Sequence, residues 1–269
     1  MSKKTFINSL LVLLLVSGCT LEPGSEIKKK ALSLENAGQF VEASEYLLAI
    51  SRSHEDFTVR TVAAQEGYRI SFFLSKDYKK SAEFLKSEIR YSSDNYQRLE
   101  AQKKLVSVYF DQLGDYISAE KEINKLLPKI MDLGERSQFQ MKLARCYFYL
   151  QNFSQAENEL KELLNKSTES RDRFQATILL ANIYLSRKNK SKAIELFNLA
   201  IEEYPELAIS ENVPVTLAVV YEETKDFKNA LAVLEANYDR YENKELIGIR
   251  INRLKEIKNK QPGAKGLRK

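Results

Sequence analysis

Few residues in this chain have the types and spacing that catalysis or metal binding requires. The 269 residues contain one histidine, His54, and two cysteines, Cys19 and Cys146. A zinc site needs a cluster of Cys and His ligands, and nucleophilic catalysis of the Ser-His-Asp or Cys-His kind needs a histidine beside its nucleophile. No glycine-rich phosphate loop follows a strand-like segment. The sequence therefore predicts no enzymatic activity, no metal and no cofactor, and Cys146 is interpreted as a buried, inert thiol.

The other cysteine closes a short export-signal pattern. Two lysines precede an apolar run over residues 6–16, which is too short to span a bilayer comfortably, and small residues follow it. The segment Val16-Ser17-Gly18-Cys19 resembles the lipobox of bacterial lipoproteins. That resemblance implies that Cys19 becomes a lipidated mature N-terminus, and Thr20, where Asp would retain the protein, favours the outer membrane. An ordinary signal peptide with a coincidental cysteine, or an uncleaved anchor, is the alternative.

Residues that could bind a partner belong to a repeating unit. Six segments align on a small residue, with spacings of 38, 38, 37, 37 and 37 residues. The small residues are Ala43, Ser81, Ala119, Ala156, Ala193 and Ala230. Four positions later stand Leu47, Leu85, Ile123, Leu160, Phe197 and Leu234. Nine positions earlier stand Leu34, Phe72, Phe110, Tyr147, Tyr184 and Tyr221.

Two further columns mark a turn inside each unit. Five positions before the small residue stand Gly38, Lys76, Gly114, Gln151, Lys188 and Lys225. Three before it stand Phe40, Tyr78, Tyr116, Phe153, Lys190 and Phe227. The small residue and the apolar residue four later share a helix face, and the turn can close the preceding helix at a left-handed position. Each unit is thus predicted to be a helical hairpin, and hairpins must stack to bury a continuous core.

The pattern resembles the tetratricopeptide repeat from about Ser25 to Tyr241. The fourth unit carries the motif as Leu143-Ala144, Tyr147, Phe153, Ala156 and Leu160. The units exceed the usual length of about 34 residues, the chain has no Trp, and Lys190 stands in the aromatic column. The resemblance implies an all-α superhelix of about six helical hairpins, and helical spacing over Glu245–Ile257 predicts a capping helix after them.

The predicted organisation is a signal peptide over 1–18, a lipidated Cys19 with a short tether over 19–24, a solenoid with its capping helix over 25–258, and a basic disordered tail over 259–269. Even fully extended, the tether reaches only about 17 Å. We therefore expect the first repeats to lie closest to the lipid.

In tetratricopeptide proteins the first helices line the concave face, and matching positions here give a candidate groove. The partner-binding candidates are Phe73, Lys104, Arg145, Phe148, Tyr149 and Asn182. The same positions add Lys28, Glu35, Glu66, Ile70, Leu74, Val108, Asp111, Met141, Ile178, Val219, Glu222 and Glu223. Apolar anchors with a charged rim suit capture of a protein or peptide. The alternative is that Phe73, Phe148 and Tyr149 only pack against neighbouring repeats.

The positive net charge of the chain comes mainly from its C-terminal segment. The net charge of +5 includes a strongly basic segment after Asn252, and the repeats themselves are slightly acidic. Nucleic-acid binding needs a basic stripe on a folded surface, so no nucleic-acid partner is expected. The tail over 259–269 is interpreted as solvated, with contact to anionic lipid or an acidic partner as the alternative.

These features together favour a membrane-anchored periplasmic scaffold that binds protein partners. In outline the chain is similar to BamD-like and pilotin-like tetratricopeptide lipoproteins, which implies a role in outer-membrane protein, secretin or pilus biogenesis. A regulator of peptidoglycan metabolism that binds a cell-wall enzyme or glycan is the alternative. The partner's identity and the oligomeric state are not determined by the sequence.

Overall fold

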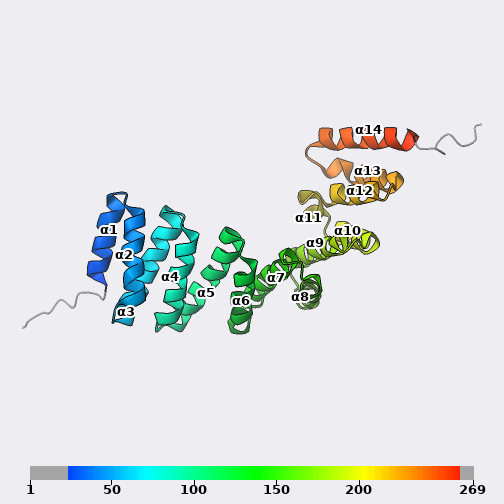
Figure 1. Cartoon of the computed structure of the whole chain (residues 1–269). Coiled ribbons are helices and arrows are strands. Elements are labelled where there is room, and N and C mark those ends of the chain that lie inside the picture. The colour runs from blue at the N-terminus through cyan, green and yellow to red at the C-terminus, as the bar shows by residue number, and fades with distance from the viewer. Residues whose placement is uncertain (1–23, 261–269) are drawn as a thin grey trace, which may run out of the picture. The chain divides into compact units, whose positions relative to one another are not determined.

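The computed structural model describes residues 24–260, and every regular element in that range is a helix. The export signal, Cys19 and the tail beyond Lys260 lie outside the described residues. The chain divides into two compact units, unit 1 ending at Ser93 and unit 2 beginning at Asp94. Figure 1 shows the helices of both units in order along the chain. Within the described residues no helix is both long and apolar enough to cross a bilayer.

Unit 1 holds two helical hairpins. The first pairs α1 (Ser25–Asn36) with α2 (Phe40–Ser53), and the second pairs α3 (Phe57–Arg69) with α4 (Tyr78–Tyr91). A π-helical stretch, η1 (Ile70–Leu74), continues α3 to the turn. Leu47, Ile70 and Phe84 lie in its core without solvent exposure.

Unit 2 holds four hairpins and a final helix. Its first hairpins are α5 (Asn95–Ser107), extended by the π-helical η2 (Val108–Leu113), with α6 (Tyr116–Leu126), and α7 (Leu133–Tyr149) with α8 (Phe153–Lys166). The next are α9 (Ser170–Ser186) with α10 (Lys190–Glu203), and α12 (Val213–Glu223) with α13 (Phe227–Asn237). Short connecting elements are η3 (Leu127–Lys129), α11 (Pro205–Ser210) and η4 (Tyr238–Arg240), and α14 (Lys244–Lys260) closes the unit.

The repeat columns define the core of both units, which confirms the predicted hairpin stack. All six small residues are fully buried, and the apolar residues four positions later are at most 1 % exposed. In each hairpin the residue three positions before the small residue begins the second helix. Ser81, the one non-Ala member of the small column, satisfies its hydroxyl with Ser71 Oγ and the carbonyl of Asp77.

The turns inside the hairpins confirm the predicted left-handed position in all six units. The backbone φ angles are 73° at Gly38, 57° at Lys76, 61° at Gly114, 60° at Gln151, 59° at Lys188 and 61° at Lys225. The residue after each left-handed position is the N-cap of the second helix. At four of these N-caps, Asp77, Asp115, Asn189 and Asp226, the side chain accepts a backbone N–H from the first turn of that helix. Four of these turns hold a side chain in a conformation that glycine adopts without strain.

The two longer repeat intervals have a structural cause that the sequence did not reveal. The relevant length is the number of residues from the N-cap of a first helix to the small residue of the same hairpin. This length is 25 residues from Asp56 to Ser81 and from Asp94 to Ala119. It is only 24 residues from Asp132 to Ala156. The extra residue is absorbed in the π-helical stretches η1 and η2, as a one-residue insertion in a helix requires.

The sixth unit departs from the prediction of one continuous first helix. Its first helix is split into α11 and α12, because Asn212 takes a left-handed conformation with φ of 54°. Pro214 at the second position of α12 explains the break, since its ring would clash with the carbonyl of Ser210 in a continuous helix. The capping helix α14 runs to Lys260, beyond the predicted end at Ile257 and two residues into the segment predicted as tail.

Candidate functional site

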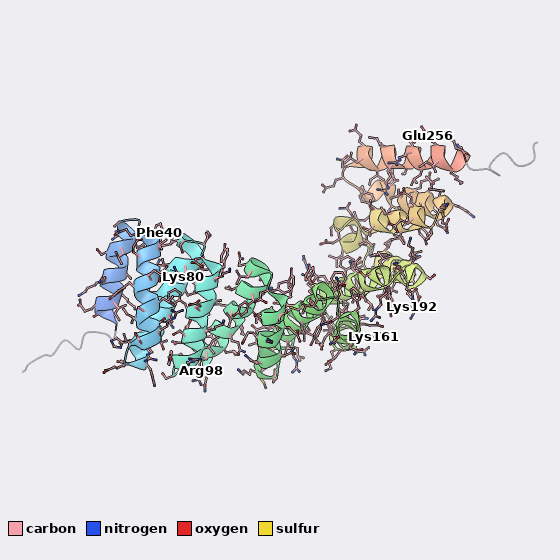
Figure 2. All side chains as sticks on the ribbon, in the orientation of Figure 1. Phe40, Lys80, Arg98, Lys161, Lys192 and Glu256 are labelled. Atoms are coloured by element: carbon pink, nitrogen blue, oxygen red, sulfur yellow. The ribbon has the colours of Figure 1, made fainter. Side chains whose placement is uncertain are left out.

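In unit 2 the first helices of successive hairpins form one surface, which we call the first-helix face. A hollow of about 390 Å³ opens on this face. Its walls come from α7, α9, α10 and the start of α12. Glu211, in the junction between α11 and α12, completes the lining. The lining residues are Arg145, Phe174, Gln175, Ile178, Leu179, Asn182, Phe197, Glu211, Val213 and Thr216. Figure 2 shows the side chains along these helices. Of the six predicted partner-binding residues, the structure brings Arg145 and Asn182 together here.

The hollow lies beside the break in the first helix of the sixth unit, and Glu211 and Val213 at this break line it. Asn212 turns the chain out of the helix, and Val213 re-enters it as a buried residue at the start of α12. The apolar floor is made by Phe174 and Phe197, which are 3 % and 1 % exposed. A rigid floor between packed helices is a suitable base for recognition, because little order is lost on binding.

The polar groups of the hollow lie around this floor. The Arg145 guanidinium donates from Nη2 to Gln175 Oε1 at 3.4 Å, which is a long hydrogen bond that leaves other donors available. Glu211, exposed at the α11–α12 junction, supplies a carboxylate on the far side of α9 from Arg145. Asn182 adds an amide that can donate and accept. An apolar floor with a cation, an amide and a carboxylate suits a peptide segment with one apolar anchor.

Phe148 and Tyr149, at the end of α7, do not reach the hollow. Phe148 is half-buried against the core and lies 5.9 Å from Phe153, ring centroid to centroid. Tyr149 is exposed but stacks on Tyr116 at 4.4 Å. Phe148 thus packs within its own hairpin, whereas Tyr149 contacts Tyr116 of the preceding repeat and is more than half exposed. Partner binding by these two residues stays a prediction.

Lys104 is exposed on α5, in the repeat directly before α7, and does not line the hollow. The next first helix carries Lys142, whose ammonium bonds both carboxylate oxygens of Asp111 at 2.9 Å and lies 4.7 Å from the Phe110 ring. This ion pair ties η2 to α7, so Asp111 holds adjacent repeats together instead of lining an open groove.

Phe73 lies in unit 1 and belongs to a separate aromatic group. Its ring is 4.9 Å from Phe72 and 6.3 Å from Tyr68, and it is more than half exposed. Nearby, Arg69 bonds the carboxylates of Glu35 and Glu66. The guanidinium of Arg69 lowers the pKa of Glu35 through this hydrogen bond. An ion-pair network of three residues thus occupies part of the first-helix face of unit 1, and Phe73 stays exposed on the same face.

Several residues that the family resemblance assigned to the groove do not lie on an open surface. Ile70, Val108 and Met141 are buried, so their assignment as groove residues was wrong. Ile70 and Val108 begin the π-helical stretches, where the altered helical period turns side chains inward. Glu222 accepts hydrogen bonds from Arg250 of the capping helix, and Glu223 pairs with Lys190.

Sequence reasoning missed six residues that line the hollow, Phe174, Gln175, Leu179, Glu211, Val213 and Thr216, and it predicted Phe197 only as a core residue. The available signal was Asn212 followed by Pro214, which interrupts the helical segment that follows Pro205. Proline inside a helical segment indicates a break, and the residues at this break line the hollow.

The chain's internal thiol lacks the features of a nucleophile. Cys146 is fully buried, and burial raises the pKa of its thiol to about 12, with the charge of Glu120 as a further cause. Among the described residues no group of His, Cys, Asp and Glu is arranged to hold a metal ion.

Comparison with known proteins supports the helical-repeat architecture. A family described as Tetratricopeptide repeat matches residues 141–208, which contain most of the hollow. A tetratricopeptide repeat protein from Parabacteroides merdae superposes with a TM-score of 0.51 at 20 % identity, covering 87 % of each chain. No curated protein sequence matches the chain.

Two further solved structures share the architecture. The structure of Naa15/Naa10 bound to HypK gives a TM-score of 0.60 at 17 % identity, over 90 % of this chain and 35 % of the other. PilW, titled a widely conserved type IV pilus biogenesis factor, gives 0.50 at 14 % identity, over 84 % and 98 %. At these identities the likeness shows the fold alone. This chain has a tetratricopeptide-repeat solenoid fold.

Proposed function

We propose that this chain is a membrane-anchored scaffold of the bacterial envelope, which binds a protein partner on the first-helix face of unit 2. The observation that carries the proposal is the hollow between Arg145 and Glu211, with its buried aromatic floor. Tetratricopeptide solenoids present such faces to peptides and proteins, and this one offers an apolar anchor site flanked by both charges.

The anchoring half of the proposal depends on Cys19. Two or more acyl chains hold a protein stably on a membrane, whereas one chain gives marginal binding. The fold similarity to PilW is consistent with work in envelope or pilus assembly. The proposed location is the periplasmic side of the outer membrane.

A crosslinking experiment in intact cells tests the partner site. A photo-crosslinking residue at Asn182 should capture a component of outer-membrane protein, secretin or pilus assembly. Arg145→Gln should strongly reduce that crosslink, while Arg136→Gln, an exposed position on the same helix outside the hollow, should leave it intact. Capture of cell-wall synthases or hydrolases would instead support regulation of peptidoglycan metabolism. Crosslinks that survive Arg145→Gln unchanged would contradict the site.

The anchor is tested separately by fractionation and mass spectrometry. Wild-type protein should sediment with membranes and carry acyl chains on an N-terminal Cys19. Cys19→Ala should release the chain into the soluble fraction. An unmodified Cys19 in mature protein would contradict the anchoring.

A further inference from the structure

The inter-repeat edge of unit 1 is the end at which α1 and α3 begin and α2 and α4 end. It carries an aromatic pair, in which Phe57 stacks on Tyr91 with ring centroids 5.4 Å apart. Phe57, the first residue of α3, is 59 % exposed. The Arg60 guanidinium lies 4.6 Å from the Tyr91 ring and 5.4 Å from the Phe57 ring. The edge thus presents an exposed aromatic ring, Phe57, stacked on the half-buried Tyr91, with a cation beside both rings.

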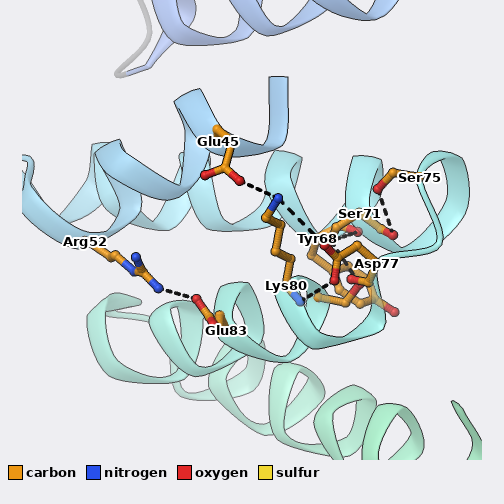
Figure 3. Close-up of polar contacts among 9 residues, drawn as sticks. Glu45, Arg52, Tyr68, Ser71, Ser75, Asp77, Lys80 and Glu83 are labelled. Atoms are coloured by element: carbon orange, nitrogen blue, oxygen red, sulfur yellow. Dashed lines mark hydrogen bonds and ion pairs between the residues drawn. The ribbon is translucent and has the colours of Figure 1, made fainter. Parts of the chain in front are cut away.

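A basic hollow adjoins this pair. Its volume is about 250 Å³, and its lining consists of Ser51, Arg52, Glu83, Lys86, Ser87, Arg90 and Tyr91. Figure 3 shows that Arg52 pairs with Glu83, the one carboxylate of the lining. The hydrogen bond from Arg90, with the charge of Arg60, lowers the pKa of the Tyr91 hydroxyl. The hollow therefore suits an anion.

Two other carboxylates lie in the loop before α3. Asp56 accepts the backbone N–H of Thr58 at 2.7 Å and so caps the helix. Glu55 is exposed in the same loop. Both belong to the α2–α3 connection and do not line the basic hollow.

The start of the described chain lies close to this edge. A Cβ added to Gly24 would lie 2.8 Å from Cγ1 of Val62, so Gly24 packs directly against α3. Val62 is five residues from Phe57, a rise of about 7.5 Å along the helix. Cys19 precedes Gly24 by five residues, which span at most about 17 Å. A lipid on Cys19 would thus hold this edge near a bilayer.

We propose that the inter-repeat edge of unit 1 rests on the surface of an anionic bilayer. Phe57 and Tyr91 lie at headgroup level, where amphipathic aromatic rings are favoured, and Lys86 and Arg90 contact headgroup phosphates. This inference rests on the proposed anchoring through Cys19, and it adds which edge of the repeats faces the lipid.

The absence of tryptophan from the sequence allows a direct test. Phe57→Trp would place a single fluorophore at the edge, in the full lipidated chain on vesicles of phosphatidylethanolamine and phosphatidylglycerol with brominated acyl chains. Val41→Trp is the matched control, because Val41 is also 59 % exposed but lies beside Phe40 at the opposite end of α2 (Figure 2). We expect a blue shift and strong quenching for Phe57→Trp only.

The outcomes separate the inference from the anchoring on which it rests. If both proteins float with the vesicles but emit alike, the edge does not face the lipid and the inference is overturned while the anchor stands. If neither protein floats with the vesicles, the anchoring fails and the inference with it.

Charge variants provide the second arm. Lys86→Gln with Arg90→Gln, added to Phe57→Trp, should reduce the quenching, and added salt should reduce it further by screening. Lys76→Gln with Lys79→Gln, near the opposite edge, should leave it unchanged. Circular dichroism of each variant checks that the helices remain folded. Equal quenching in both charge variants would overturn the proposed headgroup contacts.

Discussion

The first-helix faces of the two units differ although their cores follow the same columns. In unit 1 the face carries an ion-pair network of Arg69 with Glu35 and Glu66. In unit 2 a broken helix opens a hollow beside Arg145. The buried positions are thus alike in all hairpins, whereas the exposed face differs from repeat to repeat. In a solenoid each repeat contacts only its neighbours, so a local break changes the surface without disturbing distant repeats.

The cores should respond alike in both units. Phe84→Ala in unit 1 and Phe197→Ala in unit 2 each remove a fully buried ring, and each should cost about 3–5 kcal/mol of unfolding free energy. Urea denaturation followed by circular dichroism measures both. A cost for Phe197→Ala close to that of a surface substitution would show that the floor of the hollow is not core.

The faces should respond differently. Arg145→Gln should weaken capture of the partner by about 10- to 100-fold, since it removes a charged contact worth about 1–3 kcal/mol, and should barely change stability. Arg69→Gln should leave capture intact and lower stability by no more than about 1 kcal/mol, because its ion pairs are partly exposed. Binding assays with the crosslinked partner and thermal melts measure the two effects. Equal loss of capture in both variants would erase the distinction between the units.

Unit 2 should also carry an acid-sensitive contact. Glu157 bonds Lys161, Tyr184 and Arg187, and these partners, Lys161 first, lower the pKa of its carboxyl to about 2. Because the folded pKa is depressed, its stabilisation is present above the ordinary value of 4.5 and is lost as pH falls toward 2. Glu157→Gln should cost about 2 kcal/mol at neutral pH, with the difference from wild type shrinking below pH 4.5. A difference independent of pH would contradict this assignment.

The smallest expected effect concerns the turns, which the two units share. Lys76→Gly in unit 1 and Lys188→Gly in unit 2 relieve a left-handed backbone, and each should raise stability by about 1 kcal/mol. Gly38→Ala should lower it by a similar amount, because its φ is 73°. Thermal melts compare the three variants with wild type. Destabilisation by both glycine substitutions would mean that the lysine side chains make contacts that outweigh the backbone strain.

The sequence determined the number of hairpins, the buried columns and the left-handed turns, because these features depend on residues within one repeat. Ala156 and Leu160 share a helix face at any geometry of the array, and the turn column five positions before the small residue closes the preceding helix. The capping helix followed from the same periodicity.

Which residues of the exposed face lie together depends on the tertiary structure. Whether Phe148 packs or binds depends on Phe153 of the neighbouring helix, and whether Arg145 lines a hollow depends on where Asn212 breaks a helix 67 positions away. The extra residue in two repeats could have been placed in a loop, yet the structure absorbs it as π turns that bury Ile70 and Val108. Packing between helices decides which of these positions line a hollow, and spacing within one repeat does not contain that information.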